Sequence, residues 1–211
     1  MKSDIIEIQS DLSGKEEAFK AADGFIAYNR LEGKNAMHIR LLTEELVSMV
    51  HGIMDKFRGS LWFESENTDD GVLCRICLSA KRGVDPKEEE HFLSVSSSGK
   101  NENAKGVLGK IREAFRVSAQ HSADGVYMNE YVALNNWYSM GSHRFNVQNE
   151  ELSEQYWSLA NYRNSLPRDN SDSKEEWDEL EKSIIAKLSD DVKVWLKSDS
   201  TEVVIERLIK R

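Results

Sequence analysis

The sequence holds few residues of the kinds that interrupt or cross-link a fold. Two prolines and two cysteines occur among 211 residues, so long segments can run as helix or strand without a break. No apolar run approaches the roughly 18–20 residues of a membrane span. Residues 1–12 carry acidic side chains where a signal peptide would have its apolar region. These absences predict a cytoplasmic protein with no membrane partner.

Metal-binding and redox patterns are also scarce. Cys74 and Cys77 have C-x-x-C spacing, but no second cysteine pair completes a zinc site. Their neighbours favour a strand, on which residues three apart point to opposite faces, so we expect two ordinary strand cysteines. None of the five histidines has a partner four residues away, the spacing of a paired metal site on a helix. We therefore expect no metal site.

Positive charge is in deficit, and the deficit is uneven. The formal net charge is -9, which argues against nucleic acid as a partner because phosphate-backbone binding needs clustered Lys and Arg. Residues 149–191 hold 12 acidic and 5 basic side chains, whereas residues 81–118 hold 6 and 8. The acidic stretch 149–191 is therefore a candidate face for a basic protein partner.

Apolar residues are numerous enough for a folded core, with 7 Phe, 6 Tyr, 5 Trp and 6 Met. Their periodicity divides the chain into strand and helix segments. Strands are predicted at 4–8, 60–66, 72–80, 91–98, 192–196 and 203–208. Helices are predicted at 14–29, 35–57, 105–120, 149–166 and 174–188. Strands and helices are segregated, which predicts an α+β fold: a two-layer sandwich of a mixed, mostly antiparallel sheet with helices on one face.

Aromatic residues are concentrated in the middle of the chain, where the secondary-structure pattern is weakest. Two interpretations stay open: a recognition surface, since Tyr and Trp are enriched at binding hot spots, or a second small core. The residues concerned are Tyr127, Tyr131, Trp137, Tyr138, Phe145, Tyr156 and Trp157.

Three stretches resemble the histidine-kinase-type ATPase (GHKL or Bergerat) fold, and within it the bacterial anti-sigma-factor serine kinases. Residues 5–31 are similar to the family's first strand and helix, 38–53 to its N-box helix, and 179–211 to its last helix and two terminal strands. The resemblance implies one domain, with a core of residues 1–86 and 173–211 and a large insertion, 87–172, before the last helix.

The N-box of that family pairs a glutamate, which activates the attacking group, with an asparagine one helical turn later, which holds Mg²⁺. Glu45 falls on the glutamate position, so the resemblance makes it a candidate residual catalytic base. The asparagine position is Met49, whose thioether is a poor ligand for a hard cation. Met49 could line an apolar ligand pocket or belong to the core.

The family's second motif, Asp-x-Gly-x-Gly, would fall at residues 78–86. The aspartate position is Ser79, which can accept a hydrogen bond but carries no charge, and Gly83 alone falls on a motif glycine. Lys81 and Arg82 could bind a phosphate or carboxylate, or lie in a solvated loop. No glycine-rich lid is evident in 96–106.

With these departures, the resemblance implies a catalytically degenerate protein that acts as a regulatory protein-binding module, as anti-sigma factors do. Its partner would be a sigma factor or an antagonist-like regulator, no ATP or magnesium cofactor is expected, and homodimers are common among the kinases it resembles. The alternative is a nucleotide-binding protein or serine/threonine kinase with an atypical ATP site. A ligand-sensing domain of unrelated chemistry is the third hypothesis.

Overall fold

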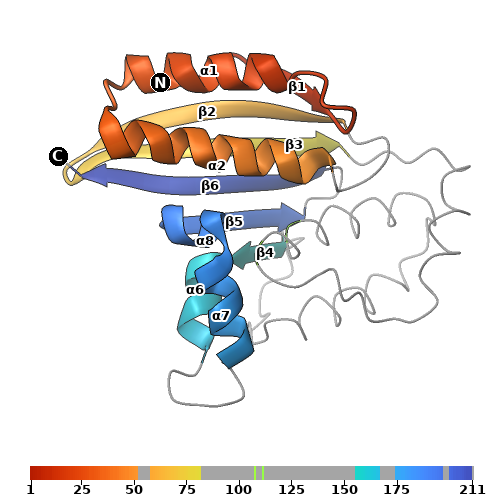
Figure 1. The fold of residues 1–211 in the computed structure, drawn as a ribbon, viewed down its shortest axis with the longest axis vertical. Helices are drawn as coiled ribbons and strands as arrows, with labels where there is room; N and C mark the ends of the chain where they lie inside the picture. Colours follow the sequence, from red (N-terminus) through yellow and green to blue (C-terminus); the bar gives the residue numbers. More distant parts are fainter. Residues whose placement is uncertain are drawn as a thin grey trace, which may run out of the picture.

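The N-terminal part of the chain builds a strand, two helices and a long hairpin (Figure 1). The computed structural model describes residues 1–51, 58–81, 107, 111, 155–166, 174–196 and 200–210. These first elements are β1 (Ile6–Gln9), α1 (Lys15–Tyr28), α2 (Gly33–His51), β2 (Arg58–Thr68) and β3 (Gly71–Lys81). They confirm the predicted strand, helix pair and hairpin. The last residues of the helix predicted at 35–57 lie outside the described part.

The C-terminal part adds three further strands and three short helices. They are β4 (Gln155–Ser158), α6 (Leu159–Ser165), α7 (Lys174–Lys182), α8 (Ile184–Leu188), β5 (Asp191–Leu196) and β6 (Ser200–Lys210). The six strands form one sheet in the order β1-β2-β3-β6-β5-β4. Every described pair is antiparallel, so the predicted α+β class is confirmed.

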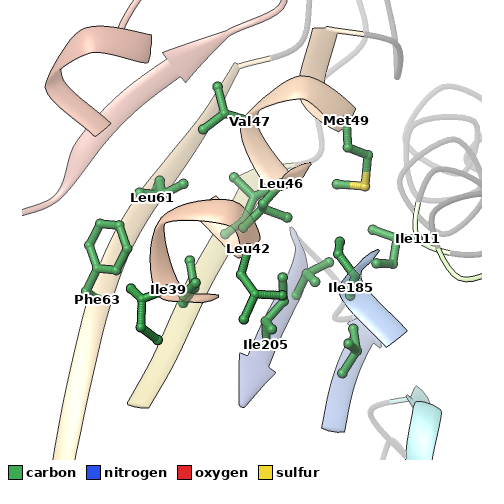
Figure 2. Packing of buried hydrophobic residues seen from close by; sticks show 14 of the residues in the cluster. Ile39, Leu42, Leu46, Val47, Met49, Leu61, Phe63, Ile111, Ile185 and Ile205 are labelled. Carbon is green, nitrogen blue, oxygen red and sulfur yellow. The ribbon is translucent and has the colours of Figure 1, made fainter. Parts of the chain in front are cut away.

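Helices α1 and α2 lie side by side and run along the direction of β2, β3 and β6 (Figure 1). Apolar side chains on the underside of both helices meet one face of the sheet, because strand side chains alternate between faces. Phe25 of α1 and Phe63 of β2 are 1% and 0% exposed, and their ring centroids lie 5.4 Å apart. The core sits between the two layers, and its members include Ile39, Leu42, Leu46, Leu61 and Ile205 (Figure 2).

Two predicted helices differ from the structure. The helix predicted from 149 is wrong at Gln155–Ser158, which is an extended strand beside β5. Ser158 ends that strand and caps α6, because its hydroxyl accepts the Asn161 N–H at 3.2 Å. The helix predicted at 174–188 is interrupted at Ser183, whose extended backbone and hydroxyl cap start α8 as a separate helix.

Part of the predicted insertion belongs to the main sheet. β4 forms its edge, and Leu159 of α6 is fully buried in the common core. Val107 and Ile111 are helical and buried in the same core, as expected within the helix predicted at 105–120. The strand predicted at 91–98 lies outside the described residues.

Candidate functional site

Helix α2 carries both residues that fall on the N-box positions. Its buried stripe faces the sheet, and Glu45 stands beside that stripe, half-buried. Met49, one turn further on, is 1% exposed. Figure 2 shows it among core side chains that include Leu46, Ile111 and Ile185. Of the two interpretations of Met49, the structure favours a core residue.

Ser79 lies on the other side of the sheet from Glu45 and Met49. In β3 the side chains of Ile76, Leu78 and Ala80 enter the core under α2. Ser79 alternates with them and therefore points to the opposite face, level with Ser60 and Glu202 on the neighbouring strands. A shared base-and-phosphate pocket for Ser79 and Glu45 is therefore wrong, because the sheet separates the two side chains.

The remaining candidates of the second motif lie at the end of β3. Lys81 is the last residue of that strand and pairs with Ser200. Arg82 and Gly83 lie outside the described residues. The contact of Lys81 or Arg82 with a phosphate or carboxylate stays a prediction.

Thr201 is a polar residue on the helix-covered face that sequence patterns did not single out. It lies level with Ala80 and Leu196, is 0% exposed, and its hydroxyl has no hydrogen-bond partner within the described part. A buried polar group without a partner is unfavourable. In the sequence, Thr201 precedes a run of strand-forming residues and resembles any other strand residue. That its hydroxyl lacks a described hydrogen-bond partner follows from tertiary packing, which the sequence pattern does not show.

The two cysteines behave as predicted for strand residues. Cys74 belongs to the core under the helices, whereas Cys77, three positions on, lies on the opposite face. Both thiols are free and buried. Burial raises the pKa of Cys74 to about 11 and that of Cys77 to about 12. Such thiols stay protonated at neutral pH and are poor nucleophiles and metal ligands.

The sheet face opposite α1 and α2 carries a ladder of cross-strand ion pairs. Arg75 contacts Glu66 at 3.1 Å and Glu206 at 3.2 Å, and Lys193 contacts Glu206 at 2.7 Å. Such partly exposed pairs specify strand register more than they add stability.

Metal ligands and membrane spans are absent from the part of the chain that the structure describes. No three His, Cys, Asp or Glu side chains within it gather closely enough to hold an ion. No described helix is long and apolar enough to cross a bilayer.

Neither protein-family models, nor curated proteins, nor solved structures give a match.

The described residues do not fit a magnesium–nucleotide site of the kind the resemblance implies. The position expected to ligate the metal is a buried thioether, and the position expected to bind the base faces away from α2. Within the described residues, neither Met49 nor Ser79 supplies Glu45 with the metal-binding or base-binding group that the family's site would place beside it.

Proposed function

We propose that this protein is a catalytically degenerate relative of the histidine-kinase-type ATPases that works by binding a regulatory protein partner. The element order and the position of α2 over the sheet are compatible with that family. The observation that carries the proposal is the burial of Met49 at the position of the metal-binding asparagine. Without that ligand, phosphoryl transfer loses the cation that neutralises developing charge.

The acidic stretch 149–191 supplies a surface for such a partner. In its described part, α7 exposes Asp178 and Glu181, and Asp190 is exposed before β5. Like-charged side chains on one short segment attract a basic protein and speed its association. By resemblance, the partner would be a sigma factor or an antagonist-like regulator.

Partner capture from the native cell tests this proposal. The full chain is used as bait beside a variant with Asp178→Lys and Glu181→Lys. The matched control reverses two exposed acids of α1, Glu16→Lys and Glu17→Lys. We expect one regulatory partner, retained by the α1 control and lost or weakened at least tenfold by the α7 variant. Recovery of chaperones alone, or equal recovery by both variants, would contradict the proposal.

One observation favours the alternative, a nucleotide-binding protein or kinase with an atypical site. Thr201 offers a buried hydroxyl without a described partner on the α2 side of the sheet. A base or ribose could use such a group. Thr201→Val should then remove thermal stabilisation by nucleotide, whereas the proposal above predicts that this substitution leaves the response to nucleotide unchanged.

A further inference from the structure

Two unpartnered polar atoms lie at the opposite end of β6 from Thr201. His38 is in the second turn of α2, and Arg207 is near the end of β6; Figure 1 shows the start of α2 and the end of β6 at the same end of the molecule. The His38 Nδ1 and the Arg207 Nε atoms are both buried and have no hydrogen-bond partner among the described residues. Buried polar atoms usually have one.

The Arg207 guanidinium forms an ion pair through Nη1, and its Nε atom has no described hydrogen-bond partner. Its Nη1 atom contacts the Asp190 carboxylate at 3.4 Å, and Asp190 is itself held by the Leu208 N–H at 2.6 Å. This leaves the Nε side of the guanidinium, one of the two edges that can bind an oxyanion with two parallel hydrogen bonds. Register places Arg207 level with Cys74, on the helix-covered face that also holds Ile205 and Ile209.

The surroundings of His38 are positive. Burial, with the charges of Arg207 and Lys34, lowers the pKa of His38 below its usual range. Asp190 is the acidic group described beside Arg207, and it occupies the Nη1 side. The Arg207 and Asp190 side chains are 24% and 52% exposed, so the site lies next to solvent, while its two donor atoms are themselves buried.

We propose that Lys34, His38 and Arg207 form an oxyanion-binding site, which we call the oxyanion site, for a phosphate or carboxylate group. The anion would accept from Arg207 Nε–H and from His38 Nδ1–H, with Lys34 adding charge. It would supply the acceptor that both buried atoms lack. The site lies at the other end of α2 from Met49 and does not depend on the function proposed above.

Thermal melting and histidine NMR of the full chain test the site. Sodium phosphate and sodium acetate are compared with sodium chloride at equal ionic strength. At ten times its Kd, a bound anion should raise the Tm by about 3 to 6 °C, and it should shift the His38 ring resonances. A response to phosphate alone assigns a phosphate site, a response to acetate alone assigns a carboxylate site, and both assign a general one. No response beyond that to chloride would overturn the proposal.

Three variants separate binding from general charge effects. Arg207→Lys keeps the charge but removes the Nε edge, and His38→Gln removes the imidazole; each should reduce affinity at least tenfold. Arg40→Lys makes the same exchange at an exposed α2 arginine that pairs with Asp23, and it should bind like the parent. Unchanged anion affinity in both site variants would refute the assignment. If Arg207→Lys fails to fold, the anion affinity of His38→Gln alone tests the site.

Proton linkage gives an independent readout. A bound anion offsets the repulsion between the charged imidazole of His38 and the cations Lys34 and Arg207. It should therefore raise the His38 pKa measured by NMR. By the same linkage, affinity for acetate, whose charge is constant in this range, should increase as the pH falls from 8 to 6. Affinity that is independent of pH, with an unmoved His38 pKa, would contradict a direct role for His38.

Discussion

At the scale of single residues, the identity of the side chain at position 49 limits the chemistry available to α2. Met49 fills the space between α2, Ile111 and Ile185 (Figure 2). Glu45, one turn earlier, remains half-buried beside it. A carboxylate can act as a base only where a substrate and its counter-ion are positioned, and neither the core around Met49 nor the side chain of Ser79 supplies that arrangement.

Replacing Met49 with asparagine tests whether the position belongs to the core. Met49→Asn removes packed atoms and buries an amide, so we expect a loss of about 2–4 kcal/mol in the free energy of unfolding. Urea denaturation measures it. Met37→Asn on the same helix, where the methionine is 52% exposed, should change stability by less than about 0.5 kcal/mol. A stable Met49→Asn variant that gains Mg²⁺ affinity would mean that the position is a ligand site.

The thiols give a second prediction. Because the pKa values of Cys74 and Cys77 are raised to about 11 and about 12, both should react with a disulfide reagent far more slowly in the native protein than in guanidinium chloride. As the pH rises, the thiols ionise in the unfolded chain before they ionise in the folded protein, and this favours unfolding. The contribution of thiol burial to the free energy of unfolding is therefore present below pH about 9 and lost as the pH rises toward the folded-state pKa values. Rapid native labelling at pH 7 would contradict this account.

At the scale of elements, α1 shows how one glycine can weaken a helix while another is required. Gly24 is exposed inside α1, and a Cβ there would meet nothing within 4 Å. Gly14, which precedes the helix, has φ +83°, and a Cβ there would lie 1.9 Å from the Glu7 carbonyl oxygen. We therefore predict that Gly24→Ala stabilises the protein by about 0.5–1 kcal/mol.

Gly14→Ala is the matched comparison and should destabilise by more than about 1 kcal/mol. Both variants are measured by urea denaturation under the same conditions. If Gly24→Ala were destabilising instead, some other molecule or segment would have to approach α1 closely at that point.

The edge of the sheet at β4 depends on one carboxylate. Asp191 accepts from the Ser158 hydroxyl at 3.0 Å and from the Ala160 N–H at 2.9 Å, which ties the β4–α6 junction to the start of β5. Asp191→Ala leaves both donors without that acceptor, so it should cost about 1–3 kcal/mol. Amide hydrogen exchange should accelerate at 155–166 more than in α1; equal exchange in the two regions would refute this role.

At the scale of the whole molecule, elements that pair with a neighbour in the sequence were predictable, whereas the surroundings of single side chains were not. The turn at 67–71 between two β-rich runs predicted β2 and β3, because hairpin partners are neighbours in sequence. β4 was missed because Gln155–Ser158 is short and Tyr156 lies at helical spacing from Leu152 and Leu159, although aromatic residues favour strands. Whether Ser79 faces α2 depends on strand register. The lack of a described hydrogen-bond partner for the Thr201 hydroxyl and for Arg207 Nε depends on packing between distant segments.

The described part of residues 87–172, the predicted insertion, contributes to the common core. Trp157 of β4 is half-buried, packs on the core and contacts Tyr162 with ring centroids 6.1 Å apart. This favours the core interpretation for that one aromatic residue. Tyr127, Tyr131, Trp137, Tyr138 and Phe145 lie outside the described residues.

The most direct test of the account is thermal melting of the full chain with millimolar ATP and Mg²⁺, against the same concentration of magnesium chloride. Arg207→Lys is melted in parallel, because the oxyanion site would itself take a phosphate. We predict that the variant's Tm does not change with nucleotide. A ligand at 100 times its Kd adds about 2.7 kcal/mol, a rise of several degrees for a chain of this size. Such a rise in Arg207→Lys, abolished by adding Glu45→Ala or Thr201→Val, would contradict the account and establish a working nucleotide site.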